Sequence, residues 1–217
     1  MGTISTTKLA GFSIALGPVI AVIFYFLQPG IALIDQADPA DATAVINALT
    51  ANSGLTTLTG ILISVGLVIL VYGIFFIAGE IRGNGNGDAL VRYAVPMILI
   101  GLVGFIFGNG IIVSIGNDVG TSAAPLFHVG SGIAGIAGIF FSLGFLAFFL
   151  ALASREEYNS TLAYIVSVVS VITVVVSIIG FSDNSQLEWT SGVNGIGYVI
   201  FTIYSIILGK DLISREE

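Results

Sequence analysis

The sequence contains no cysteine and very few charged residues. Without thiols the chain has no disulfides, no iron–sulfur cluster, no thiolate metal site and no cysteine nucleophile. Charged residues fill 9% of the 217 positions, whereas a water-soluble domain carries roughly 25% because its surface must be hydrated. Most of the surface must therefore face something other than water, and the lipid bilayer fits that requirement.

Basic residues are scarcer than acidic ones. Six lysines and arginines stand against 13 acids, which gives a formal net charge of −7. Nucleic acids are bound through clusters of Lys and Arg, so we expect no nucleic-acid partner. The single histidine cannot supply the paired axial ligands of a b-type haem or a multi-histidine metal site. We therefore predict that the protein uses no cofactor and no metal.

Apolar runs make up most of the chain, in which 56% of the residues are hydrophobic. A helix crosses the hydrocarbon layer with about 20 apolar residues, and a helix satisfies its own backbone hydrogen bonds there. The sequence therefore predicts an all-α, polytopic membrane bundle of six transmembrane helices, and we expect residues 1–217 to form one membrane-embedded domain. The six segments, none with a charged residue in its interior, are 9–34, 55–78, 93–115, 125–153, 161–181 and 192–209.

The positions of the basic residues predict the orientation of the chain in the membrane. With six spans they fall at the two termini and in the second and fourth connections, and the other three connections contain none. Because basic residues are enriched in cytoplasmic loops, we predict that both termini are cytoplasmic and that the protein lies in the plasma membrane. The six residues are Lys8, Arg82, Arg92, Arg155, Lys210 and Arg215.

The first external connection, residues 35–54, is the longest. It carries several acids, and its portion from Asp41 to Leu49 is expected to form a short surface helix.

Small residues recur at spacings of three or four in two of the predicted helices. This spacing places them on one helix face, and small residues let two helices approach closely in lipid. The pattern predicts tight packing, either inside the chain or against a partner helix. The residues are Gly101, Gly104 and Gly108 in the third segment and Gly130, Ala134, Gly138 and Ser142 in the fourth.

Three polar residues are expected at a similar depth in the outer leaflet. They are Asn109, His128 and Asn194, each counted along its helix from the nearest external connection. Polar groups in hydrocarbon are costly unless they are paired, so these side chains are expected to find partners. One interpretation is a small polar pocket that opens to the outside, with Asp118 beside it. The other, which we favour, is hydrogen bonding between helices or contact with headgroups.

Two functions remain open after these observations. The first is a non-enzymatic accessory, assembly or scaffold subunit that packs against partner helices or a second copy. The second is a carrier or sensor of a small neutral or lipidic molecule, which would bind in the polar pocket. An enzyme is less favoured, because no nucleophile–base motif is present. An ion-coupled pump is also poorly supported, since the spans lack buried acids and bases.

Short motifs resemble those of the DUF4386 family of six-span membrane proteins. Lys8-Leu-Ala-Gly11 resembles the start of the first helix of that family, and Glu80-Ile-Arg82 the charged turn that ends its second helix. Arg155 resembles the basic residue that closes its fourth helix. The third segment departs from the pattern, because Arg92 stands there without the further charged residues of the family. The resemblance implies the six-span layout and no known activity.

Overall fold

The computed structural model describes residues 4–83, 85–117 and 123–215, and this part of the chain consists of helices and their connections. Each of the long helices is apolar and long enough to cross a membrane. The prediction of a multi-pass helical bundle is therefore confirmed, and the chain is an integral membrane protein. The long helices are α1 (Thr6–Leu27), α3 (Ser53–Ile81), α4 (Asp88–Gly116), α5 (Ala123–Ala153), α6 (Ser160–Ser182) and α7 (Leu187–Ser214).

The first helix is shorter than predicted. The segment 9–34 was expected to be one helix, but α1 ends at Leu27. Pro29 disfavours a helical conformation in the residue before it, and Gly30 adopts a left-handed backbone with φ of 86°. The amide of Gly30 donates to the carbonyl of Ile34, so the following apolar residues form turns rather than a further helical turn.

The predicted surface helix is confirmed as α2 (Ala42–Ala51). The carboxylate of Asp41 caps its N-terminus by accepting hydrogen bonds from the amides of Thr43 and Ala44, both at 3.0 Å. One face of α2 packs on the ends of α4 and α5, with Val45 and Leu49 in a cluster around Ile115. A 3-10 turn, η2 (Asn184–Gln186), precedes α7.

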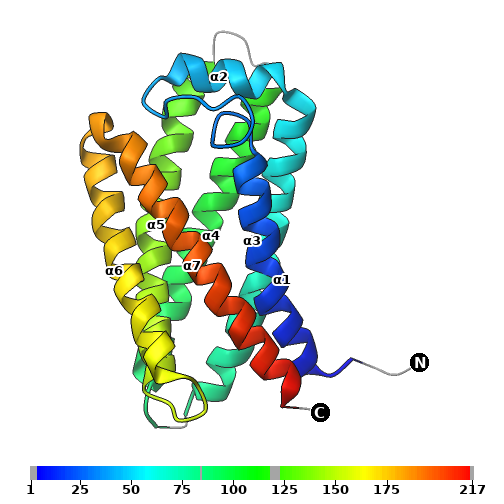
Figure 1. The fold of residues 1–217 in the computed structure, drawn as a ribbon, viewed down its shortest axis with the longest axis vertical. Helices are drawn as coiled ribbons and strands as arrows, with labels where there is room; N and C mark the ends of the chain where they lie inside the picture. The colour runs from blue at the N-terminus through cyan, green and yellow to red at the C-terminus, as the bar shows by residue number, and fades with distance from the viewer. Residues whose placement is uncertain (1–3, 84, 118–122, 216–217) are drawn as a thin grey trace.

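The long helices run along the bundle (Figure 1), and their contacts close them into a ring in chain order. Each long helix contacts the next one in the chain, and α7 contacts α1. Among the described residues, long helices on opposite sides of the ring make no comparably close backbone approach. Both ends of the chain lie at the same end of the bundle. We call it the basic end, because Lys8, Arg82, Arg92, Arg155, Lys210 and Arg215 all lie in helix ends or connections there. We call the opposite end, covered by α2, the capped end.

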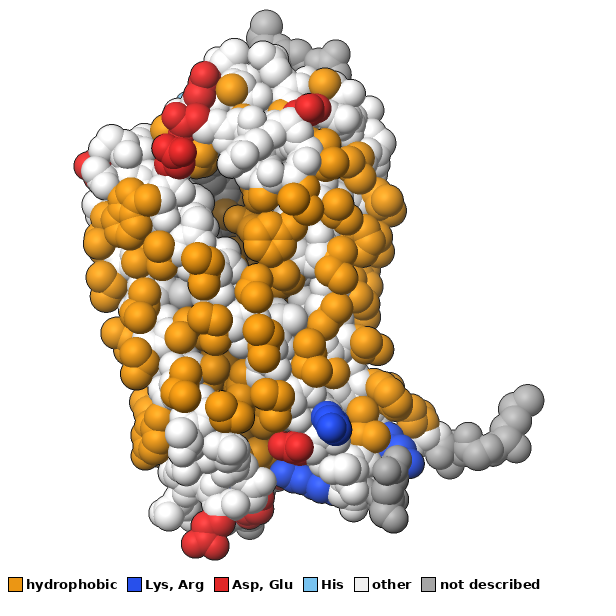
Figure 2. All heavy atoms as spheres, viewed as in Figure 1, with side chains coloured by type: hydrophobic (Ala, Val, Ile, Leu, Met, Phe, Trp, Pro, Cys, Tyr) orange, Lys and Arg blue, Asp and Glu red, His pale blue; other side chains and the backbone are white. Residues whose placement is uncertain are grey.

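The surface is banded as a membrane protein requires. On the face drawn in Figure 2, hydrophobic side chains cover the middle of the bundle and charged side chains gather at its two ends. Large apolar residues such as Phe107, Val168 and Ile196 are 60–64% exposed. Exposure of such residues is favourable in lipid and unfavourable in water.

The two small-residue series predicted from sequence pack against each other. A methyl group added to Gly101 would lie 2.8 Å from the Ala137 carbonyl oxygen, and one added to Gly104 would lie 2.6 Å from the Ala137 Cβ. Gly108 faces Ala134 and the carbonyl of Gly130. The close approach therefore joins α4 to α5 inside the chain.

The series on α5 turns partly away from this interface at Gly138. A residue four positions further along a helix is rotated by about 40°, so the row gradually leaves the face that contacts α4. Gly138 faces Tyr198 of α7, the Phe105 ring of α4 and Ser177 of α6, and Ala137 makes the closer approach to α4. Ser142 is fully buried, and its hydroxyl has no hydrogen-bond partner among the described residues.

Two of the close contacts that were not predicted join α1 to its two neighbours. A methyl group on Gly17 would lie 2.5 Å from the backbone nitrogen of Leu70 and 2.8 Å from the Gly66 carbonyl oxygen of α3. Near the basic end, a methyl group on Gly11 would lie 2.7 Å from the carbonyl oxygen of Gly209 on α7. Glycine therefore brings α1 into backbone contact with both of its neighbours.

Aromatic side chains fill the space enclosed by the long helices toward the basic end. Phe149 is 1% exposed, stacks on Phe145 at 5.2 Å between ring centroids, and lies 5.5 Å from both Phe201 and Tyr204. Phe141 extends the row from Phe145 toward the capped end. Aromatic rings therefore occupy the interior of the basic-end half of the bundle.

Candidate binding site

The helices α1 and α7 cross near the basic end and spread apart toward the capped end (Figure 1). At the crossing the backbones of Gly11 and Gly209 touch, whereas a methyl group on Gly195 would meet one atom within 4 Å, the ring carbon Cζ of Phe26 at 3.9 Å. Figure 2 shows a hollow in this face beneath the capped end. At the level of Gly195, the Phe26 ring therefore lies between α7 and α1, and no backbone of α1 comes within 4 Å of the added methyl.

Behind this opening lies a group of polar side chains, which we call the intramembrane polar cluster: Tyr25, Ser177, Asn194 and Tyr198. The amide Nδ2 of Asn194 donates to Ser177 Oγ at 3.1 Å. A methyl group on Gly138 would lie 3.6 Å from the Tyr198 hydroxyl and 3.9 Å from Ser177 Oγ. Tyr25 of α1 lies near Tyr198. Four helices, α1, α5, α6 and α7, therefore meet at this cluster.

Hydrogen bonding in and around the cluster is incomplete. The Oδ1 atom of Asn194 is buried and has no partner among the described residues, and the same holds for Ser142 Oγ, one helical turn beyond Gly138 on α5. Gln28, one turn beyond Tyr25, is 5% exposed and its Nε2 has no partner in the described part of the chain. Each such group costs about 1–3 kcal/mol.

The polar residues predicted to converge do not bond to one another. Asn109 lies on α4 and donates through Nδ2 to Ser64 Oγ of α3 at 3.3 Å. His128 is exposed on α5, with its ring edge against the neighbouring Phe127. Asp118 lies outside the described residues. Of the three predicted residues that the structure describes, Asn194 alone belongs to the intramembrane polar cluster.

Sequence reasoning missed Tyr25, Ser177 and Tyr198. A signal for Ser177 was present, because α6 carries a polar row at spacings of three and four: Ser167, Ser170, Thr173 and Ser177. The first three donate to backbone carbonyls of their own helix. Ser177 instead pairs with Asn194. The two tyrosines gave no signal, because aromatic residues near span ends are ordinary interfacial residues.

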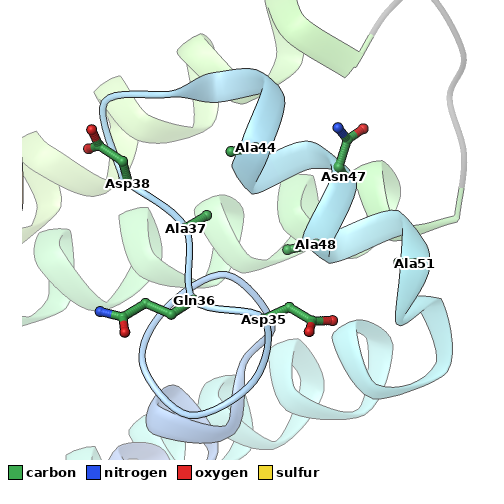
Figure 3. A pocket seen from close by; sticks show the side chains of 8 residues that line it. All are labelled: Asp35, Gln36, Ala37, Asp38, Ala44, Asn47, Ala48 and Ala51. Carbon is green, nitrogen blue, oxygen red and sulfur yellow. The ribbon is translucent and has the colours of Figure 1, made fainter.

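The capped end carries a second hollow, an open pocket of about 550 Å³ between residues 35–38 and α2 (Figure 3). Its floor is alanine, and the side chains of Asp35, Gln36, Asp38 and Asn47 point in different directions. Asp35 accepts from Asn52 Nδ2 at 2.6 Å, and Asp38 accepts from the amide of Ala40 at 2.8 Å. These acids fix the loop and do not converge on a ligand position.

A polar cluster at the basic end has a structural role. The hydroxyl of Tyr158 donates to Glu80 at 3.3 Å, and the guanidinium of Arg215 reaches Glu80 at 3.4 Å while lying 5.1 Å from the centre of the Tyr158 ring. Burial, reinforced by the charge of Glu80, raises the pKa of Tyr158 to about 12. The cluster ties the end of α7 to α3 and to the connection between α5 and α6.

Comparisons of the chain with protein-family models, with curated proteins and with solved structures find no match. Function is therefore inferred from the arrangement of the chain's own residues.

Proposed function

We propose that this protein binds a small lipidic molecule that enters from the membrane between the capped-end halves of α1 and α7. One observation supports this most directly: the capped-end halves of α1 and α7 spread apart, and the intramembrane polar cluster near them contains a buried atom without a partner, Asn194 Oδ1. Buried polar groups without partners are rare in folded proteins. A ligand that completes their hydrogen bonds would explain why buried polar groups stand here without protein partners.

The surroundings of the opening favour a lipidic ligand over a water-soluble one. Ile23 of α1 and Ile196 of α7 flank it and are 50% and 64% exposed to the region where lipid lies. The ring of Phe26 closes it. A molecule that reaches the polar cluster by this route crosses apolar side chains first, which favours an alkyl chain with a small head.

The alternative of an accessory or scaffold subunit receives less support. It was motivated by the small-residue series of the third and fourth segments, and Gly101, Gly104 and Gly130 are occupied in the contact between α4 and α5. A partner helix would have to use the apolar surface of isoleucines and valines, which lipid covers equally well.

We further propose that both termini are cytoplasmic and that the capped end faces the outside of the plasma membrane, as the positive-inside rule predicts. The binding site then lies in the outer leaflet. The six-span layout is also the one implied by the resemblance to the DUF4386 family, which we keep as a proposal.

The orientation can be tested with single cysteines, because the native chain has none. Asn47→Cys lies on α2 at the capped end, and Asn86→Cys lies in the connection before α4; both positions are exposed. In intact cells a membrane-impermeant maleimide should label Asn47→Cys and leave Asn86→Cys unlabelled. Permeabilised cells should show labelling of both. Labelling of both, or of Asn86→Cys alone, in intact cells would contradict the orientation.

Binding can be tested with a photoactivatable long-chain alcohol, hexadecanol carrying a diazirine in its chain. The full-length protein in phosphatidylcholine nanodiscs is irradiated with the probe, and the adducts are mapped by mass spectrometry. We expect saturable labelling of α1 and α7 near Tyr25 and Asn194, with competition by unlabelled hexadecanol. Weak labelling spread evenly over all lipid-facing helices, without saturation, would refute the proposal.

A matched pair of variants separates entry through the opening from general lipid contact. Gly195→Trp fills the space between α7 and Phe26 and should reduce saturable labelling about tenfold, the effect of a lost contact of about 1.4 kcal/mol. Ile203→Trp places the same side chain on a lipid-facing position of α7 about two turns nearer the basic end, where Ile203 is 55% exposed, and should leave labelling unchanged.

A further inference from the structure

We infer that the ligand carries an uncharged hydrogen-bond donor, such as an alcohol, which bonds to the Oδ1 atom of Asn194. This inference rests on the proposed function and specifies the chemistry of the ligand head. Asn194 already uses its amide nitrogen on Ser177, so the orphaned Oδ1 requires a donor and not a second acceptor.

The surroundings of Asn194 exclude a charged head. Between Glu188 and Lys210 α7 carries no charged residue, and α6 carries none from Ser160 to Ser182. By helix geometry Asn194 lies about 10 Å from the start of α7, well inside the span. A charged group held there without a counter-ion would be strongly unfavourable. A neutral donor avoids this cost.

Two other buried groups favour a head that both donates and accepts. Ser142 Oγ and Gln28 Nε2 lack partners among the described residues, and both stand one helical turn from residues at the cluster, Gly138 and Tyr25. A hydroxyl group both donates and accepts, so it can bond to Asn194 and still accept from a neighbour. An ether or ester oxygen can do only the second.

The discriminating experiment uses competition against the diazirine alcohol in the same nanodiscs. Hexadecanol and hexadecyl methyl ether have the same chain, but the ether has no donor. On the unmodified protein we expect hexadecanol to compete about tenfold better than the ether. We expect hexadecyltrimethylammonium to compete no better than the ether, since its head is charged and donates nothing.

Two asparagine variants locate the effect. Asn194→Leu should abolish the preference for the alcohol, so that alcohol and ether compete equally. Asn109→Leu also removes an intramembrane asparagine paired with a serine, but that pair is with Ser64 on α3, and the preference should persist. Preference surviving in Asn194→Leu would overturn the assignment.

The competition on the unmodified protein does not depend on the folding of any variant. Equal competition by alcohol and ether, with saturable labelling, would overturn the donor assignment while leaving the proposed function intact. Absence of saturable labelling would instead overturn the proposed function itself.

Discussion

Gly66→Ala should destabilise the bundle by about 3 kcal/mol, at the upper end of the usual range for overpacking, and lower its melting temperature in detergent by roughly 10 °C. The added methyl would lie 2.6 Å from the Gly17 carbonyl oxygen and 2.7 Å from the Ala21 nitrogen. Both are backbone atoms, so a side-chain rotation cannot relieve the contact. The helices α1 and α3 would have to separate along their whole interface.

The control for this substitution lies on the same helix. Gly79 is exposed and has nothing within 4 Å of an added methyl, so Gly79→Ala should leave the melting temperature unchanged or raise it slightly, because alanine favours helix. Circular dichroism during heating measures both variants. Equal melting temperatures for the two would mean that α1 and α3 are not in backbone contact.

Phe149→Ala should cost about 3 kcal/mol, near the lower end of the range for removing a buried aromatic side chain. The lower end is expected because the separated helices of a membrane protein remain in lipid, so the loss is packing and not transfer to water. Phe149 is 1% exposed and its ring touches four others, those of Phe145, Phe148, Phe201 and Tyr204. A cavity would open in the middle of the aromatic core.

Phe107→Ala provides the comparison, since Phe107 is 64% exposed to the lipid side and should cost less than about 0.5 kcal/mol. Unfolding in a denaturing detergent titration gives the free energy for both. A similar cost at the two positions would contradict the burial of Phe149.

Part of the site could be predicted from the sequence and part could not. Asn194 was identified because an amide in an apolar span is expected to have a partner. Its actual partner, Ser177, stands 17 positions earlier on α6, and sequence position carries no information about which helix faces which. The same limit explains why Asn109 and Asn194, at similar expected depths, pair with different serines on different helices.

The glycine contacts show the same division. The series on α4 and α5 was visible because its members repeat regularly. Gly17 contacts Gly66 of α3. Ser13, Gly17 and Ala21 repeat every four residues on α1 and are buried, so the sequence carried a signal for this face, but not for its partner helix. The early end of α1, in contrast, was marked in the sequence by Pro29 and Gly30 and follows from backbone geometry alone.

The sequence alone determined that the chain is a bundle of membrane-spanning helices, because the energetic cost of placing charge or unpaired backbone in hydrocarbon acts on each segment separately. It also determined that the basic residues lie at one end, since an even number of spans returns the chain to the same side. Tertiary structure alone decided which glycines touch, where α1 and α7 spread apart and which of the described polar groups remain without partners. These depend on the rotation and tilt of each helix against its neighbours, which packing sets.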